Sequence, residues 1–192
     1  FLRELQQGGQ TPYDAVGIQS HMHLGHWSLP YVRAVCDRYA TLGVPLHFTE
    51  VSVPSGIRGE DGVWQPTSPE EERRQRDYVS KLYTLLFGQP ALRAVSWWDL
   101  SDHNAWKGVL CGLLRADMSP KPAFDQLEEL IKKRWWTQAK GETNADGEFR
   151  VRAFHGLHRV VVEVLHHRPI TRDVVWSRGS ENVVLFVPSP RT

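Results

Sequence analysis

Apolar residues follow two different rhythms along this chain, and the change falls near residue 134. Through residues 1–134, short apolar runs alternate with segments whose apolar residues recur every three or four positions. Short runs are typical of buried strands, and the longer spacing is typical of helices. From residue 135 onward the spacing changes to two, which predicts strands and turns only.

The first region predicts the element order α-β-α-β-α-β-α. A partial helix around Leu2 and Leu5 comes first, and later helices begin after Ser28, after Ser68 and at Pro122. The expected strands span 14–21, 44–50 and 91–98. Strands that alternate with helices predict an α/β fold with a parallel sheet. Three strands cannot close a barrel, so either further strands belong to the protein or a small open sheet forms.

Residues from 135 onward predict a small antiparallel β-sandwich of four or five strands. Turn-forming residues at 144–147 and 154–156 separate the alternating segments. The candidate strands span 147–154, 157–165, 171–176 and 182–187. The chain therefore divides into two predicted domains, 1–134 and 135–192.

Charge and composition narrow the class of partner. The formal net charge is +1, so no strong field attracts nucleic acid or an anionic membrane. No apolar run approaches the roughly 20 residues that span a bilayer. Eight Trp residues are many for this length, and some of them should line a site or an interface. Cys36 and Cys111 are expected to be unpaired or buried thiols rather than a disulfide.

Polar side chains end two of the predicted strands. Glu50 follows Phe48 and Thr49, and a carboxylate there needs a cleft or hydrogen-bond partners, because an unpaired buried charge is costly. Adjacent parallel strands lie about 4.8 Å apart, so His21 should reach Glu50 and orient it. Gln19 could bind a ligand hydroxyl. Without a cleft, Glu50 is an ordinary surface residue and His21 a core histidine.

Trp98 and Trp106 flank the loop that follows the third strand. Sugar rings present C–H faces that pack on aromatic planes, so two such residues beside Glu50 could wall a sugar site. Trp97 and Trp98 point to opposite faces of the strand, and only one of them can face the cleft. Core packing is the alternative role for any single tryptophan.

No metal or cofactor site is predicted. His21, His23 and His26 are close in sequence, but they lack the Cys or carboxylate neighbours of a metal site. The chain has no Gly-rich phosphate loop, no G-x-S-x-G elbow and no CxxC pair. The Gly-, Pro- and Ser-rich segment 53–67 is a long loop of the kind that often serves a functional site.

In order and spacing, these segments resemble the C-terminal half of glycoside hydrolase family 10 xylanases. The resemblance covers about residues 1–134 and rests on four motifs: Gly17-Ile-Gln-Ser-His21, Phe48-Thr-Glu50, Ser96-Trp-Trp98 with Ser101-Asp102 and Trp106, and Pro120-Lys-Pro-Ala123. It implies that the chain holds strands six to eight of a (β/α)8 TIM barrel. A small all-β domain similar to immunoglobulin-like accessory domains would follow.

The resemblance implies a retaining endo-1,4-β-xylanase that hydrolyses the β-1,4-xylosidic bonds of xylan. Glu50 matches the nucleophile, His21 the histidine that holds it, and Gln19 the glutamine beside it. Trp98 and Trp106 match the aromatic residues that wall the xylose subsite next to the cleavage point. Retaining enzymes place a second carboxyl about 5–5.5 Å from the nucleophile.

The chain departs from the family pattern in three places. The family's acid/base glutamate lies on strand four, so this chain is expected to be a fragment that carries the nucleophile and lacks the acid/base. The family motif Thr-Glu-Leu-Asp reads Thr49-Glu50-Val51-Ser52 here, so a neutral side chain replaces the aspartate that supports the histidine. Asp99 replaces the glycine that follows the family's tryptophan and adds a carboxylate to the cleft.

These departures leave a second function open, that of a non-catalytic carbohydrate-binding or scaffold protein derived from the barrel. Activity on another β-linked glycan is a third possibility. The expected partners are xylan or xylo-oligosaccharide and the missing N-terminal half of the barrel, with no nucleic acid and no membrane. By resemblance, the full-length protein is expected to be secreted or periplasmic, although no signal segment is visible in this chain.

Overall fold

A computed structural model describes residues 1–6 and 11–177 of the chain. Two compact units are present, Phe1–Leu130 and Ile131–Thr192. The division follows residue 130, whereas the sequence pattern placed the domain boundary after residue 134.

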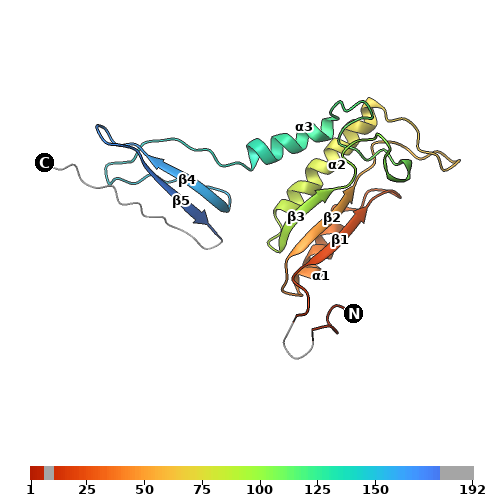
Figure 1. Ribbon diagram of the computed structural model, residues 1–192, viewed down its shortest axis with the longest axis horizontal. Helices are drawn as coiled ribbons and strands as arrows, with labels where there is room; N and C mark the ends of the chain where they lie inside the picture. The colour runs from red at the N-terminus through yellow and green to blue at the C-terminus, as the bar shows by residue number, and fades with distance from the viewer. Residues whose placement is uncertain (7–10, 178–192) are drawn as a thin grey trace. The chain divides into compact units, whose positions relative to one another are not determined.

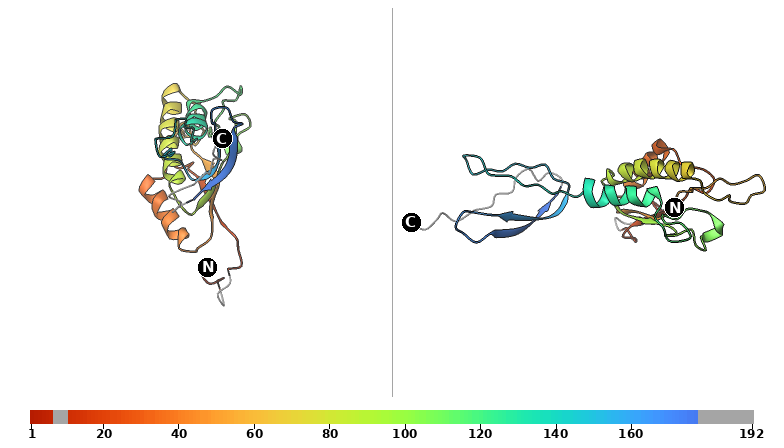
Figure 2. Two further views of the ribbon diagram at one scale, coloured as in Figure 1. Left: turned by 90° about the vertical axis from the view of Figure 1, so that its left-hand side faces the viewer. Right: turned by 90° about the horizontal axis from the view of Figure 1, so that it is seen from above.

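The first unit is built around a three-stranded parallel sheet in the order β1-β2-β3 (Figure 1). The elements in chain order are β1 (Val16–His21), α1 (Leu29–Ala40), β2 (Leu46–Ser52), α2 (Pro69–Phe87), β3 (Leu92–Trp97), the short 3-10 helix η1 (Trp106–Gly108) and α3 (Pro122–Glu129). Helices α1 and α2 lie on the same side of the sheet (Figure 2). The predicted alternation of strands and helices is confirmed in this unit.

The helix predicted around Leu2 and Leu5 is absent, and the segment 2–5 forms turns. A helix needs several consecutive hydrogen bonds to offset the entropy of its first turn. The described residues before position 7 form only two such backbone bonds, Leu5 N–H to the Phe1 carbonyl and Gln6 N–H to the Arg3 carbonyl. Apolar spacing over so few residues does not stabilise a helix.

Side-chain caps fix where α1 and α2 begin. The Ser28 hydroxyl accepts from the Tyr31 N–H, and proline occupies the first turn of both helices. At α2, the Ser68 hydroxyl accepts from the Glu71 N–H while the Glu71 carboxylate accepts from the Ser68 N–H, which is the predicted capping box. Gly88 follows the last residue of α2.

The helix-covered face of the sheet forms the apolar core. Leu46, Phe48 and Val51 of β2 are fully buried, as are Val79 and Leu82 of α2. Of the residues between these, position 47 is partly exposed and position 49 is exposed. One face of the strand therefore supplies the core and leaves the opposite face for polar side chains.

Between Phe48 and Val51, strand β2 contains one extra residue relative to each of its neighbours. Ile18 pairs with Phe48 but Gln19 pairs with Glu50, so Thr49 has no partner in β1. The β2–β3 register shifts over the same stretch. This bulge places Thr49 on the face of Gly17, where a Cβ added to the glycine would lie 3.1 Å from Thr49 Cγ2. Glu50 then lies on the same face, beside Gln19.

The second unit contains an antiparallel pair, β4 (Gly156–Val162) and β5 (Ile170–Trp176), after a π-helical segment, η2 (Leu130–Arg134). These strands correspond to the predictions at 157–165 and 171–176. The strand predicted at 147–154 is not formed. The Asn144 side chain accepts from the N–H groups of Asp146 and Glu148, which closes a turn at the start of this segment. No described strand pairs with 147–154. The prediction at 182–187 lies outside the described residues, so the immunoglobulin-like sandwich stays a prediction.

Candidate active site

The carboxyl ends of β1 and β2 bring three of the predicted site residues together. Gln19 Nε2 donates to Glu50 Oε1 at 2.9 Å, and His21 Nε2 lies 2.7 Å from Glu50 Oε2. The Glu50 side chain is 23% exposed, so the carboxylate is partly open to solvent rather than covered by apolar packing. The two contacts fix its orientation, and both oxygens keep lone pairs for a reacting atom.

Ser52 supports the imidazole from the other side. Its hydroxyl oxygen lies 2.7 Å from His21 Nδ1, and the residue is fully buried. A neutral imidazole has one donor and one acceptor nitrogen. When Nε2–H donates to the Glu50 carboxylate, Nδ1 accepts from the Ser52 hydroxyl. The hydrogen-bond network therefore assigns one tautomer to His21, and Ser52, noted in the sequence only as a departure, supplies a contact to the histidine.

Trp98 and Trp106 form an aromatic wall beside His21. The imidazole centroid lies 5.9 Å from the Trp98 ring and 4.9 Å from the Trp106 ring. The two indoles are 38% and 40% exposed, so ligand can reach them. Trp97 points away from this wall, as alternation across a strand predicts, and its Nε1–H donates to the Cys111 carbonyl at 3.0 Å.

His23 and Lys107 also contact the Trp106 indole. The His23 ring lies 5.5 Å from Trp106 and 5.3 Å from His21, and Lys107 Nζ lies 4.4 Å above the Trp106 ring. Burial, His21 and Lys107 lower the pKa of His23, while Asp99 opposes this shift. In the sequence, the spacing of His23 suggests only a metal ligand, and the place of Lys107 directly after Trp106 is the signal that could identify it.

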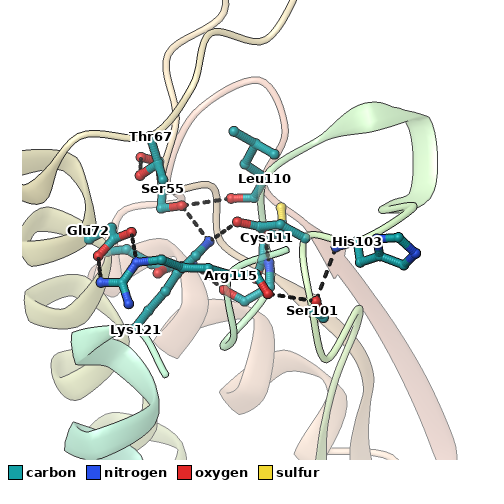
Figure 3. A network of polar contacts seen from close by, with 12 residues as sticks. Ser55, Thr67, Glu72, Ser101, His103, Leu110, Cys111, Arg115 and Lys121 are labelled. Atoms are coloured by element: carbon teal, nitrogen blue, oxygen red, sulfur yellow. Dashed lines mark hydrogen bonds and ion pairs between the residues drawn. The ribbon is translucent and has the colours of Figure 1, made fainter. Parts of the chain in front are cut away.

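A buried polar network holds the loop between β3 and α3 (Figure 3). Lys121 is fully buried, and its Nζ lies 2.6 Å from Asp102 Oδ2 and donates to Ser55 Oγ at 2.8 Å. Asp102 Oδ1 accepts from the Gly112 N–H at 2.8 Å, and the Ser55 hydroxyl donates to the Leu110 carbonyl at 2.9 Å. Burial lowers the pKa of Lys121, and the hydrogen bond to Asp102 opposes that shift.

A second ion pair extends this network toward α2 (Figure 3). Arg115 Nε and Nη2 contact the two carboxylate oxygens of buried Glu72 at 2.9 and 2.5 Å. The Arg115 carbonyl accepts from the Ser101 hydroxyl at 2.9 Å, and that hydroxyl accepts from the His103 N–H at 3.1 Å. These contacts therefore connect the loop between β3 and α3 to helix α2.

An open hollow of about 410 Å³ adjoins the aromatic wall. Its walls come from the segment after β1, including His23, and from the loop 53–67, including Arg58 and Trp64. Arg58 and Trp64 pair as an isolated antiparallel bridge, which gives this loop a defined hairpin form. The volume lies in the range of ligand clefts. His23 lines this hollow and also contacts Trp106, so one residue is shared by the hollow and the aromatic wall.

Three further observations concern the described part of the chain. Residues 1–6 and 11–177 contain no group of three or more His, Cys, Asp or Glu side chains placed to hold a metal ion. Within the same ranges, no helix has the length and apolar character that a bilayer crossing requires. Cys36 and Cys111 are buried and unpaired, and burial raises the pKa of their thiols to about 11 and about 12.

Comparison with curated proteins finds relatives that are much longer than this chain. Endo-1,4-beta-xylanase 2 of Arabidopsis thaliana is 28% identical over 196 residues, which cover 97% of this chain and 16% of that protein. The anti-sigma-I factor RsgI6 of Acetivibrio thermocellus is 26% identical over 168 residues, 87% of this chain and 20% of that protein. The chain thus spans a fifth or less of the length of either relative.

Solved structures and a family model point the same way. Xylanase 10B from Thermotoga petrophila, solved in complex with xylobiose, is 26% identical with a TM-score of 0.55, and the match covers 69% of this chain and 40% of that one. This likeness favours part of a (β/α)8 barrel over a small open sheet. Residues 1–130 match the model of glycosyl hydrolase family 10. Because that match covers 130 of the 192 residues, the chain belongs to this family.

Proposed function

We propose that the full-length protein is a retaining endo-1,4-β-xylanase in which Glu50 is the nucleophile. The observation that carries this proposal is a partly exposed carboxylate held by Gln19 and His21 beside two open indoles. The indole faces suit the C–H face of a sugar ring, and the polar groups around the carboxylate suit its hydroxyls. The bound xylobiose in the Thermotoga petrophila structure supports a xylo-oligosaccharide as the ligand class.

The proposed chemistry follows from the position of Glu50. The carboxylate attacks the anomeric carbon while a second carboxyl protonates the leaving oxygen, and water then hydrolyses the glycosyl-enzyme. The second carboxyl must lie about 5–5.5 Å from Glu50, and we take it to come from barrel strands outside this chain. His21 and Gln19 would keep the carboxylate oriented through both steps, because each binds a different oxygen.

The test is Glu50→Gln in the full-length protein, assayed by release of reducing ends from xylan. The amide keeps the shape of the side chain but cannot form the glycosyl-enzyme, so hydrolysis should be lost. Glu128→Gln, at an exposed position on α3, is the matched control and should retain full activity. Full activity in Glu50→Gln would remove the assignment.

A second candidate is a glycan-binding protein without turnover. The neutral Ser52 beside His21 favours it, as does the similarity to a protein named as an anti-sigma factor. An aryl β-xyloside with a good leaving group separates the two functions, because its cleavage needs little acid assistance. A burst of aryl product supports a competent nucleophile. Binding of xylo-oligosaccharide with no burst supports the binding protein.

A further inference from the structure

The loop that carries Trp106 begins in a backbone conformation that L-residues rarely adopt. Asp99, directly after Trp98, has a φ of 56°, in the left-handed region that glycine favours. Asn104 and Lys107 in the same loop have φ values of 52° and 56°. Such conformations persist only where the surroundings hold them, and they cluster at ligand-binding sites.

The Asp99 carboxylate joins the start of this loop to Trp106. Its Oδ2 accepts from the Trp106 N–H at 2.8 Å. The base of the loop is held by other groups, since the Asp102 N–H donates to the Leu114 carbonyl at 3.0 Å and the Asp102 carboxylate pairs with Lys121. Asp99 therefore acts on the part of the loop where Trp106 lies.

The side-chain contacts of Trp106 leave its orientation dependent on the hydrogen bond to Asp99. The indole is 40% exposed, and its ring neighbours are His21, His23 and Trp98. None of those ring contacts fixes the Trp106 main chain. Its carbonyl accepts from the Val109 N–H at 3.2 Å, and its own N–H donates to Asp99. A carboxylate acceptor makes the second bond about twice as strong as a neutral acceptor would.

We propose that Asp99 is a positioning residue that orients the Trp106 indole and thereby sets the affinity of the site for a xylose ring. This inference rests on the proposed function. Three substitutions separate the possible contributions of Asp99. Asn tolerates the left-handed conformation and keeps a side-chain oxygen as acceptor. Gly relieves the backbone and removes the acceptor, and Ala removes the acceptor while keeping the strain.

The experiment uses the full-length protein with 5-fluorotryptophan incorporated, and Trp106→Phe assigns the Trp106 fluorine resonance. Steady-state kinetics on xylotetraose supply KM and kcat for each variant. We expect Asp99→Gly and Asp99→Ala to raise KM about tenfold, the size of one hydrogen bond to a charged group, with kcat changed less than twofold. The ligand-free Trp106 resonance should shift in both, while the KM of Asp99→Asn should lie between those of wild type and Asp99→Gly, because a neutral acceptor keeps about half of the bond strength.

Asn104→Gly is the matched control, because it relieves another left-handed residue of the loop and leaves the Asp99 contact intact. It should match the wild type in KM and in the Trp106 resonance. An unchanged resonance and KM in Asp99→Gly would overturn the proposal, as would an Asp99→Asn variant as impaired as Asp99→Gly. If Asp99→Ala fails to fold, Asp99→Gly retains the test. If the wild type neither binds nor cleaves xylotetraose, the proposed function fails, while the resonance still tests the positioning.

Discussion

Replacing Lys121 with methionine should destabilise the protein far more than breaking an exposed ion pair of the same length. The Lys121 side chain is 0% exposed and Asp102 is 5% exposed, with 2.6 Å between the charged atoms. Arg74 and Glu70 on α2 form a pair of 2.5 Å, but their side chains are 65% and 64% exposed. The two pairs thus match in length and differ in burial.

The expected magnitude follows from what each substitution leaves behind. Lys121→Met keeps most of the apolar stem but leaves the Asp102 carboxylate buried, and among the described residues the Gly112 N–H is its remaining hydrogen-bond donor. Removing one partner of a buried pair costs about 3–5 kcal/mol. Arg74→Met should cost about 0.3–0.5 kcal/mol, because water solvates the remaining Glu70.

Thermal unfolding of the full-length variants, followed by calorimetry, measures this difference. For a domain of 150–250 residues, about 2–4 °C per kcal/mol gives a loss of roughly 6–20 °C for Lys121→Met and about 1–2 °C for Arg74→Met. Adding Asp102→Asn to Lys121→Met should recover part of the loss, because the unpaired charge disappears. Equal shifts for Lys121→Met and Arg74→Met, or no recovery in the double variant, would refute the reasoning.

Three further predictions concern individual side chains. Ser52→Ala should lower kcat/KM on xylan by up to about tenfold, since one hydrogen bond to His21 is lost, and an unchanged rate in steady-state kinetics would contradict this. Cys36 and Cys111 should resist alkylation at pH 8 until the protein unfolds, as mass spectrometry can count, because burial raises their pKa to about 11 and about 12. Burial also raises the pKa of Tyr78 to about 12. The thiols and the phenol therefore lose their protons at lower pH in the unfolded state than in the folded state, so the free energy of unfolding should fall above about pH 9. Urea midpoints that stay constant from pH 7 to 11 would argue against this.

Local signals in the sequence were sufficient for the order of elements from β1 onward in the first unit, but not for the helix predicted around Leu2 and Leu5. The cap at Ser68 and the glycine at 88 delimit α2 because they satisfy backbone groups within a few residues. The juxtaposition of His21 and Glu50 followed from the geometry of parallel strands. The bulge was also visible, because the buried apolar positions shift phase by one residue between Phe48 and Val51. The regular strand predicted over 44–50 does not account for this shift.

Other features had no local signal. Alternation at 147–154 indicates which face a strand would bury, but a strand forms only where another backbone pairs with it. The pair between Lys121 and Asp102 joins residues on opposite sides of a loop, and no periodicity reports such a contact. The contact from Asp99 to Trp106 depends on a left-handed backbone that a single Asp in a sequence does not reveal.

The unpaired Thr49 makes the site depend on an irregularity that a protein designer would remove. Without Thr49, apolar and polar residues would alternate regularly from Leu46 to Val53, as the pattern of a half-buried strand requires. The shortened strand would nonetheless lose the Thr49 side chain beside Gly17, and the register that pairs Glu50 with Gln19 would change. A regular strand would therefore lose the present pairing of Glu50 with Gln19, which is a reason to leave position 49 unchanged in engineered variants.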